Sequence, residues 1–284
     1  MNIKRVGIVG SGIMGSGIAE VAAKAGFDVV LRSRARATAD AMVAGLEKAL
    51  AKQVDKGRLE ATEREATLGR VRAVTELAEL AECDLVIESI VEDLPVKQQL
   101  FDDLDRLVSD SAILATNTST LPVVELAMRT GRPDRVCGVH FFNPASAMPL
   151  VEIVRAITTS DDTAAEAREF AEGCGKSPVE VRDQAGFVVN ALLFPYLNNA
   201  VKLYDAGVAS RDDIDAAMKG GCNFPMGPLE LLDLVGLDTS LAILEALYAE
   251  FKDPNYAPAP RLRRMVSAEH LGRKTGQGFY NYRK

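Results

Sequence analysis

The sequence predicts an α/β protein in which a doubly wound parallel sheet is followed by a smaller all-helical domain. Apolar runs alternate with helical patterns from residue 6 to residue 181, a glycine-rich turn follows the first run, and only helical patterns follow residue 186. We therefore divide the chain into a dinucleotide-binding domain, 1–183, and a helical domain, 184–284, joined through residues 183–186.

The first predicted strand, 6–9, runs into the string GSGIMGSG and then into a helix over 13–25. Gly10 permits a tight turn, Gly12 lets the backbone approach a pyrophosphate, and Gly15 lets the helix pack closely on the strand. A second strand at 29–31 completes a βαβ unit. Because the glycines lie between a strand and a helix, we interpret them as a Rossmann-type dinucleotide site rather than as a turn that binds nothing. The expected cofactor contacts are Gly10, Ser11, Gly12, Ile13, Met14 and Gly15.

The end of the second strand carries Arg32, Ser33 and Arg34, where an NAD site usually has Asp or Glu for the ribose 2′-hydroxyl. Two guanidiniums and a hydroxyl suit a 2′-phosphate, because arginine presents a fork of donors to phosphate oxygens. We therefore assign these residues to cofactor binding and expect NAD(H) or NADP(H). The alternative is a solvated strand end that binds nothing.

Composition narrows the class of function. The 284 residues are 48% hydrophobic, which is ample for a core, and the net charge of −7 argues against general binding to nucleic acid or to an anionic membrane. No segment is long and apolar enough to span a bilayer, and the N-terminus shows no signal-peptide pattern. We expect a cytoplasmic protein with a small-molecule ligand.

The sequence predicts no metal site. It holds only two histidines, and its four cysteines form no CxxC pair. The cysteines lie in apolar or small-residue surroundings, which favours reduced thiols in the core. They are Cys83, Cys137, Cys174 and Cys222.

A helical hairpin is expected after the second strand, with a long amphipathic helix over 37–56, a turn at Gly57 and a shorter helix over 59–68. Lysines on such a hairpin are more often solvated than bound to a ligand. Further strands are expected at 71–75, 85–88, 112–116, 136–139 and 177–181, and further helices at 96–107, from Pro122, and at 163–172.

The helical domain is predicted to hold helices at 188–204, 212–219, 229–235, 237–251 and 260–268. A domain of this size with short loops can barely bury its own core. We therefore expect the protein to form a homodimer.

Polar side chains follow several predicted strands at their carboxyl ends, where doubly wound sheets bind ligands. Glu92 and Lys97 follow the strand at 85–88, the string TNTST follows the next strand, and His140 follows the strand at 136–139. The alternative for Glu92 is a helix-capping carboxylate, and the alternative for Lys97 is a solvated lysine.

His140 is the candidate general base, because imidazole titrates near neutrality and can take a proton from an alcohol while hydride leaves the same carbon. Glu152 lies in the apolar run MPLVEIV, where an unpaired charge is costly, and pairing with the imidazole would fix its tautomer. The alternatives are a satisfied core imidazole for His140 and an edge-strand carboxylate facing water for Glu152.

Several strings together resemble the 3-hydroxyacyl-CoA dehydrogenase family in its short, single-function 3-hydroxybutyryl-CoA dehydrogenase form. In chain order they are GSGIMGSGIA, VEDLPVKQQLF, TNTST, GVHFFNPASAMPLVEIV, GFVVNALLFPYLNNA, FPMGPLELLDLVGLD and GRKTGQGFYNY. The resemblance implies a helical C-terminal domain that forms the dimer. It also implies interconversion of (3S)-3-hydroxyacyl-CoA and 3-oxoacyl-CoA with a nicotinamide cofactor, in fatty-acid or butanoate metabolism.

The resemblance also implies residue roles. It makes His140 the base, Glu152 its carboxylate partner, and Ser119 and Asn190 the residues that hydrogen-bond the substrate. Dinucleotide contacts are implied for Glu92, Lys97, Asn143 and Lys274, with Asn117 close by, and coenzyme A contacts for Lys56, with Lys52 a neighbouring candidate. The chain departs from the family pattern at Ser33, Ala49 and Ala191, where an acid, a serine and an arginine are usual.

Two other functions stay open at this point. A dehydrogenase of a free hydroxy acid or a sugar acid, such as gulonate, would share the glycine loop and the His–Glu pair but would need fewer basic residues in the hairpin. A dinucleotide-binding protein without catalysis would need none of the four residues that the resemblance places at the reaction centre.

Overall fold

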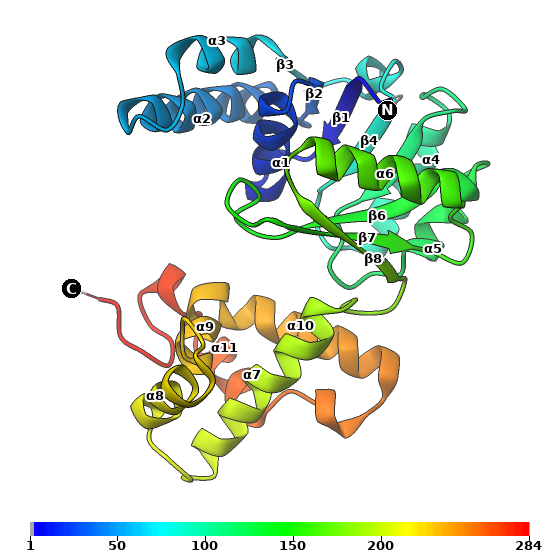
Figure 1. Cartoon of the computed structure of the whole chain (residues 1–284). Coiled ribbons are helices and arrows are strands. Elements are labelled where there is room, and N and C mark those ends of the chain that lie inside the picture. Colours follow the sequence, from blue (N-terminus) through cyan, green and yellow to red (C-terminus); the bar gives the residue numbers. More distant parts are fainter. Residues whose placement is uncertain (1–2, 284) are drawn as a thin grey trace. The chain divides into compact units, whose positions relative to one another are not determined.

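The computed structural model describes residues 3–283 and divides the chain into two compact units, residues 1–183 and 184–284. The N-terminal unit is a parallel-dominated sheet with helices, and the C-terminal unit is helical, which confirms the predicted fold class. Figure 1 shows the elements of each unit in sequence colours.

The N-terminal unit is built on one eight-stranded sheet of order β3-β2-β1-β4-β5-β6-β7-β8. All neighbouring strands are parallel except β6 and β7, which are antiparallel. β2 and β4 lie on opposite sides of β1, so the strand order changes direction between β1 and β4, and ligands bind at such a switch point. The strands are β1 (Arg5–Val9), β2 (Asp28–Arg32), β3 (Val71–Val74), β4 (Leu85–Glu88), β5 (Ile113–Thr116), β6 (Val136–Phe141), β7 (Leu150–Arg155) and β8 (Ser177–Arg182).

Helices cover both faces of this sheet (Figure 1). α1 and α6 pack on one face and contribute Ile18, Ala22 and Phe170 to a core cluster with the strands. α4 and α5 lie on the other face and bury Phe101 and Leu126. The bounds are α1 (Ile13–Lys24), α4 (Leu94–Asp105), α5 (Val123–Ala127) and α6 (Asp161–Gly173).

The predicted hairpin is formed by α2 (Arg36–Asp55) and α3 (Ala61–Gly69), which lie together beside β3 (Figure 1). α2 buries Met42, Leu46 and Leu50, whose spacing of four residues places them on one helix face. Gly57 takes the left-handed conformation (φ +64°) and reverses the chain. The other face of α2 is exposed.

The C-terminal unit packs α7 (Val189–Asp205), α8 (Arg211–Cys222), α9 (Pro228–Val235), α10 (Leu237–Phe251) and α11 (Pro260–Ser267) around one apolar core. Two buried carboxylates join its parts. Asp215 accepts hydrogen bonds from the first N–H groups of α9, at Leu229 (2.8 Å) and Glu230 (3.0 Å). Asp233 accepts from the N–H groups of Phe279 and Tyr280, both at 2.8 Å, so the last segment of the chain is fixed to α9.

Two details differ from the sequence-based expectation. The sixth strand continues through Phe141, because β7 supplies pairing partners for His140 and Phe141. The core placement is wrong for Cys222, which is exposed at the end of α8, whereas Cys83 and Cys137 are buried and Cys174 is partly buried. All four thiols are free. No helix among residues 3–283 combines the length and the apolar character needed to cross a membrane.

Candidate functional site

The glycine loop after β1 has no room for a side chain at two of its positions, Gly10 and Gly15. A Cβ atom on Gly10 (φ +128°) would lie 2.2 Å from the carbonyl oxygen of Ser89, and one on Gly15 would lie 2.0 Å from that of Gly10. A Cβ on Gly12 would meet nothing within 4 Å, so this glycine leaves open space at the start of α1. The first N–H groups of α1 have no side-chain cap there. The loop therefore fits the pyrophosphate of a dinucleotide.

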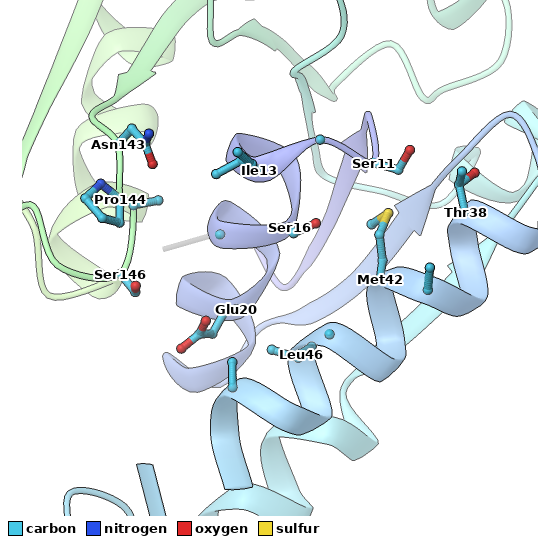
Figure 2. Close-up of a pocket in the computed structure, with 16 residues that line it drawn as sticks. Ser11, Ile13, Ser16, Glu20, Thr38, Met42, Leu46, Asn143, Pro144 and Ser146 are labelled. Atoms are coloured by element: carbon cyan, nitrogen blue, oxygen red, sulfur yellow. The ribbon is translucent and has the colours of Figure 1, made fainter. Parts of the chain in front are cut away.

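Two hollows flank this loop and share Ser11 and Gly12. We name the first the α1–α2 groove. It has a volume of about 480 Å³ and lies between the start of α1, one face of α2 and residues 143–146 (Figure 2). We name the second the β2 pocket. It has a volume of about 510 Å³ and is lined by the ends of β1, β2 and β4 and by α4.

His140 and Glu152 are direct partners across the antiparallel β6–β7 pair. Nδ1 of His140 lies 2.8 Å from Oε2 of Glu152, and the two residues are 3% and 0% exposed. β7 lies between β6 and β8, so the edge-strand alternative for Glu152 is wrong. A carboxylate only accepts hydrogen bonds, so this contact places the imidazole proton on Nδ1 and the lone pair on Nε2.

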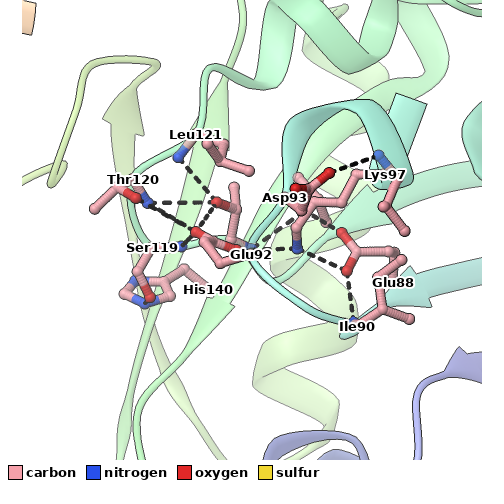
Figure 3. Close-up of polar contacts among 12 residues, drawn as sticks. Glu88, Ile90, Glu92, Asp93, Lys97, Ser119, Thr120, Leu121 and His140 are labelled. Carbon is pink, nitrogen blue, oxygen red and sulfur yellow. Dashed lines mark hydrogen bonds and ion pairs between the residues drawn. The ribbon is translucent and has the colours of Figure 1, made fainter. Parts of the chain in front are cut away.

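Ser119 lies on the other side of the imidazole, with its Oγ 3.0 Å from Nε2 of His140. It belongs to the loop that follows β5, and Figure 3 shows its side chain beside the ring. Asn117, in the same loop, accepts a hydrogen bond from the N–H of Phe141 at 2.8 Å. The ends of β5 and β6 are thereby tied together, and Glu152, His140 and Ser119 form one continuous array.

A second array lies at the carboxyl end of β4 (Figure 3). Nζ of Lys97 lies 2.7 Å from Oε1 of Glu88 and 3.1 Å from Oε2 of Glu92. Lys97 is 1% exposed and Glu88 is 0% exposed, so the solvated-lysine alternative is wrong. Oε1 of Glu92 accepts the N–H of Ser119 at 3.0 Å. Lys97 therefore connects a buried strand-end carboxylate to the backbone of the loop that carries Ser119.

The charge on Glu92 is stabilised within this array. Burial opposes the charge, but Lys97, the hydroxyl of Thr118 and the N–H of Ser119 outweigh that effect and lower the pKa of Glu92 below its ordinary value. Glu92 thus acts as an acceptor for the loop after β5 and is more than a cap of α4, whose N-cap is Asp93.

Glu88 is the residue of this array that the sequence analysis missed. Besides its ion pair with Lys97, the Glu88 carboxylate accepts hydrogen bonds from the N–H of Ile90 and from the hydroxyl of Thr116, both at 2.7 Å. The available signal was a carboxylate that ends an otherwise apolar strand, LVIE, nine residues before a lysine. A charge in that position needs a partner, and the lysine provides one.

The other predicted site residues occupy three places. Asn143 lines the α1–α2 groove, and Arg32, Ser33 and Arg34 line the β2 pocket. Lys52 and Lys56 are exposed at the end of α2. Within residues 3–283, no three His, Cys, Asp or Glu residues are grouped so that they could hold a metal ion.

Two predicted residues belong to the C-terminal unit. Asn190 is buried in the first turn of α7. Nζ of Lys274 lies 2.6 Å from both carboxylate oxygens of Asp238, so its charge is paired inside that unit. Their contacts with substrate and dinucleotide stay predictions.

Comparison with known proteins adds independent findings. Residues 5–184 match the model of the 3-hydroxyacyl-CoA dehydrogenase NAD binding domain, and residues 186–282 match that of the 3-hydroxyacyl-CoA dehydrogenase C-terminal domain. The chain is 48% identical over 282 residues to a 3-hydroxybutyryl-CoA dehydrogenase of Mycobacterium tuberculosis, covering 99% of each chain. It is 46% identical over 280 residues to that of Clostridioides difficile, covering 99% of this chain and 100% of the other.

A solved structure agrees with these matches. The crystal structure of (S)-3-hydroxybutyryl-CoA dehydrogenase from Ralstonia eutropha superimposes with a TM-score of 0.97 at 42% identity and covers 100% of both chains. The similarity therefore extends over both units and is not limited to the dinucleotide-binding fold.

The Lys97 array generates a stability prediction. Lys97→Met leaves Glu88 charged and buried without its ion-pair partner, so we expect a loss of about 3 kcal/mol in the free energy of unfolding. The loss is measured as a lowered thermal midpoint in differential scanning calorimetry.

The matched control is the double variant Glu88→Gln/Lys97→Met, which removes both charges. It should recover part of the stability lost in Lys97→Met, because an uncharged pair leaves no unpaired buried ion. A Lys97→Met midpoint equal to that of the wild type would contradict the assigned role of the ion pair.

Proposed function

The chain belongs to the 3-hydroxyacyl-CoA dehydrogenase family, and from this premise we propose that it interconverts (3S)-3-hydroxybutyryl-CoA and acetoacetyl-CoA. It is an oxidoreductase of 3-hydroxyacyl-CoA with an NAD-binding domain. The observation that carries the substrate chemistry is the array of Glu152, His140 and Ser119, with contacts of 2.8 and 3.0 Å.

The array supplies the proton chemistry. The nicotinamide of NAD(H), when bound, accepts or returns the hydride at C3 of the acyl chain. In the oxidative direction Nε2 of His140 takes the proton of the 3-hydroxyl, and in the reductive direction it returns this proton to the 3-oxo oxygen. Glu152 holds the Nδ1–H and stabilises the imidazolium that forms. Ser119 donates a hydrogen bond to the same substrate oxygen, and Asn190 is the second residue that we assign to it.

We assign the dinucleotide to the glycine loop and to the carboxyl ends of β2 and β4. Glu92, Asn117 and Asn143 lie in loops that leave this edge of the sheet. Because Lys97 is enclosed between Glu88 and Glu92, its effect on the cofactor passes through Glu92 and the loop that Glu92 holds. Lys274 is the contact that we assign from the C-terminal unit.

We assign the pantetheine arm of the acyl-CoA to the α1–α2 groove. Its α2 side includes Ala41, Gly45 and Ala49, which recur at every fourth residue and therefore line one helix face with small side chains. Lys52 and Lys56 follow at the end of the same helix and are exposed. They are therefore placed to meet the phosphates of coenzyme A, and a free hydroxy acid would make no use of them.

We also propose that the protein acts as a homodimer through α7. Leu192 and Leu203 are 71% and 47% exposed, and their spacing places them with Tyr196 on one helix face. The ring of Phe224 lies 5.4 Å from that of Tyr196 and is 41% exposed, which extends the apolar surface. Contiguous apolar surface of this kind is typical of an interface.

His140→Ala should lower the turnover of acetoacetyl-CoA reduction by about two to four orders of magnitude, because the general base is lost. Glu152→Gln should give a smaller loss of at least about tenfold, since an amide neither fixes the tautomer nor stabilises the imidazolium. The measurement is the initial rate followed by nicotinamide absorbance. Unchanged dinucleotide affinity in a fluorescence titration is the control for folding, and near-native turnover of His140→Ala would refute the base assignment.

Acetoacetyl-CoA should be reduced with a far higher specificity constant than acetoacetate. Lys56→Ala should raise the KM for acetoacetyl-CoA by about threefold to fivefold, the effect of one exposed charge pair. The matched control is Lys4→Ala, because Lys4 precedes the amino end of β1 and the proposed site lies at the carboxyl end. Equal rates with both substrates would instead favour a dehydrogenase of free hydroxy acids.

Light scattering after size-exclusion chromatography should give twice the chain mass of 30.5 kDa. Leu192→Glu should shift the protein toward the monomer, because the charge would be buried in the interface. Met128→Glu, at an exposed apolar residue of the N-terminal unit, is the control and should leave the dimer unchanged. A monomer mass for the wild type at assay concentration would contradict the proposal.

A further inference from the structure

Building on the function proposed above, we propose that the β2 pocket binds the 2′-phosphate of NADP(H), so that the phosphorylated cofactor serves this enzyme at least as well as NAD(H). The residues that recognise it are Arg32 and Arg34. The dinucleotide assignment above places the cofactor at this pocket, and the inference adds the group on the cofactor that the two arginines would select.

The position of the pocket fits this ligand. The β2 pocket begins at Gly10 and Gly12 and extends to the end of β2, to residues 89–91 after β4, and to Leu100 of α4. In a sheet of this order the pyrophosphate lies at the glycine loop and the adenosine ribose lies at the end of β2. The ribose 2′ position therefore faces residues 32–34.

The charge of the pocket also fits. Nε of Arg32 donates to the carbonyl oxygen of Thr75 at 3.0 Å, which orients the guanidinium and leaves both Nη groups for a ligand. Arg34 is exposed, and within residues 3–283 neither arginine forms an ion pair. By contrast, Arg36 is paired with Asp40 at 2.9 Å. Two guanidiniums without a carboxylate partner form a site for a dianion.

The mutual repulsion of these two residues supports the same conclusion. Burial and the neighbouring charge of Arg34 lower the pKa of Arg32, and Glu76 offsets part of the shift. A phosphate between the guanidiniums would relieve this repulsion. Asp103 also lines the pocket, but it belongs to α4, and its carboxylate lies 3.7 Å from Arg106.

Ser33 favours a 2′-phosphate mainly because its side chain carries no negative charge. It is 2% exposed and its hydroxyl is bonded to the hydroxyl of Thr38. Because Thr38 donates its own proton to the carbonyl oxygen of Ala35 at 2.8 Å, Ser33 is the donor in that contact and has no proton left for a phosphate. A carboxylate in place of Ser33 would accept from a ribose hydroxyl but would repel a phosphate.

The first test compares cofactors in acetoacetyl-CoA reduction by the full chain. The wild type should show a kcat/KM for NADPH equal to or higher than that for NADH. Arg34→Ala should lower the NADPH-to-NADH ratio of kcat/KM by about tenfold, and Ser33→Glu by about a hundredfold, as expected for lost or reversed contacts to a charged group. Arg36→Ala, the paired neighbour, is the matched control and should leave the ratio within about twofold.

The second test needs no turnover. Isothermal titration should show adenosine 2′,5′-bisphosphate binding at least about tenfold more tightly than ADP, with the difference reduced in Arg34→Ala and at high salt. If NADH alone supports reduction and the two nucleotides bind alike, the 2′-phosphate site is refuted while the dehydrogenase function stands. If neither cofactor supports reduction but the bisphosphate still binds more tightly, the site stands and the proposed reaction is refuted.

Discussion

The site depends on the backbone register between β6 and β7. This register places Glu152 opposite His140, in a layer of the sheet where neither side chain meets solvent. A carboxylate buried in that way is costly unless a donor faces it, and the Nδ1–H of the imidazole is that donor. The pair therefore holds one ring orientation, in which Nε2 lies 3.0 Å from the hydroxyl oxygen of Ser119. Because β7 and β8 run opposite to the other six strands, the antiparallel β6–β7 pair brings base and carboxylate together.

The same solution occurs a second time at the end of β4. Glu88 and Lys97 are buried charges that neutralise each other, and Glu92 extends their contact to the loop after β5. Glu152 thus holds the Nδ1 side of the imidazole. The array of Glu88, Lys97 and Glu92 holds the loop that carries Ser119, which lies on the Nε2 side. Both arrays consist of short contacts among strands, the loops that follow them and, through Lys97, helix α4, which is why the carboxyl edge of the sheet can present several polar groups in fixed positions.

The parts that the sequence predicted are those with a local signal. The glycine loop, the arginines after β2 and the hairpin each depend on neighbours within a few residues, and the structure has them where the pattern placed them. The burial of Lys97 has no local signal, since a lysine in an amphipathic helix resembles a surface residue until its strand-end partner Glu88 is known. The direction of β7 and the exposure of Cys222 likewise follow from distant packing. Roles for Asn190 and Lys274 came from the family resemblance alone.

The connection between β6 and β7 has a consequence for natural length variation in this protein. Residues 142–149 lie outside both strands, so an insertion or deletion there leaves the cross-strand partners unchanged. A single-residue insertion inside β7, between Glu152 and Arg155, would shift one side of the pairing and turn alternate side chains to the opposite face. Homologues that keep the activity should therefore keep the length of both strands constant.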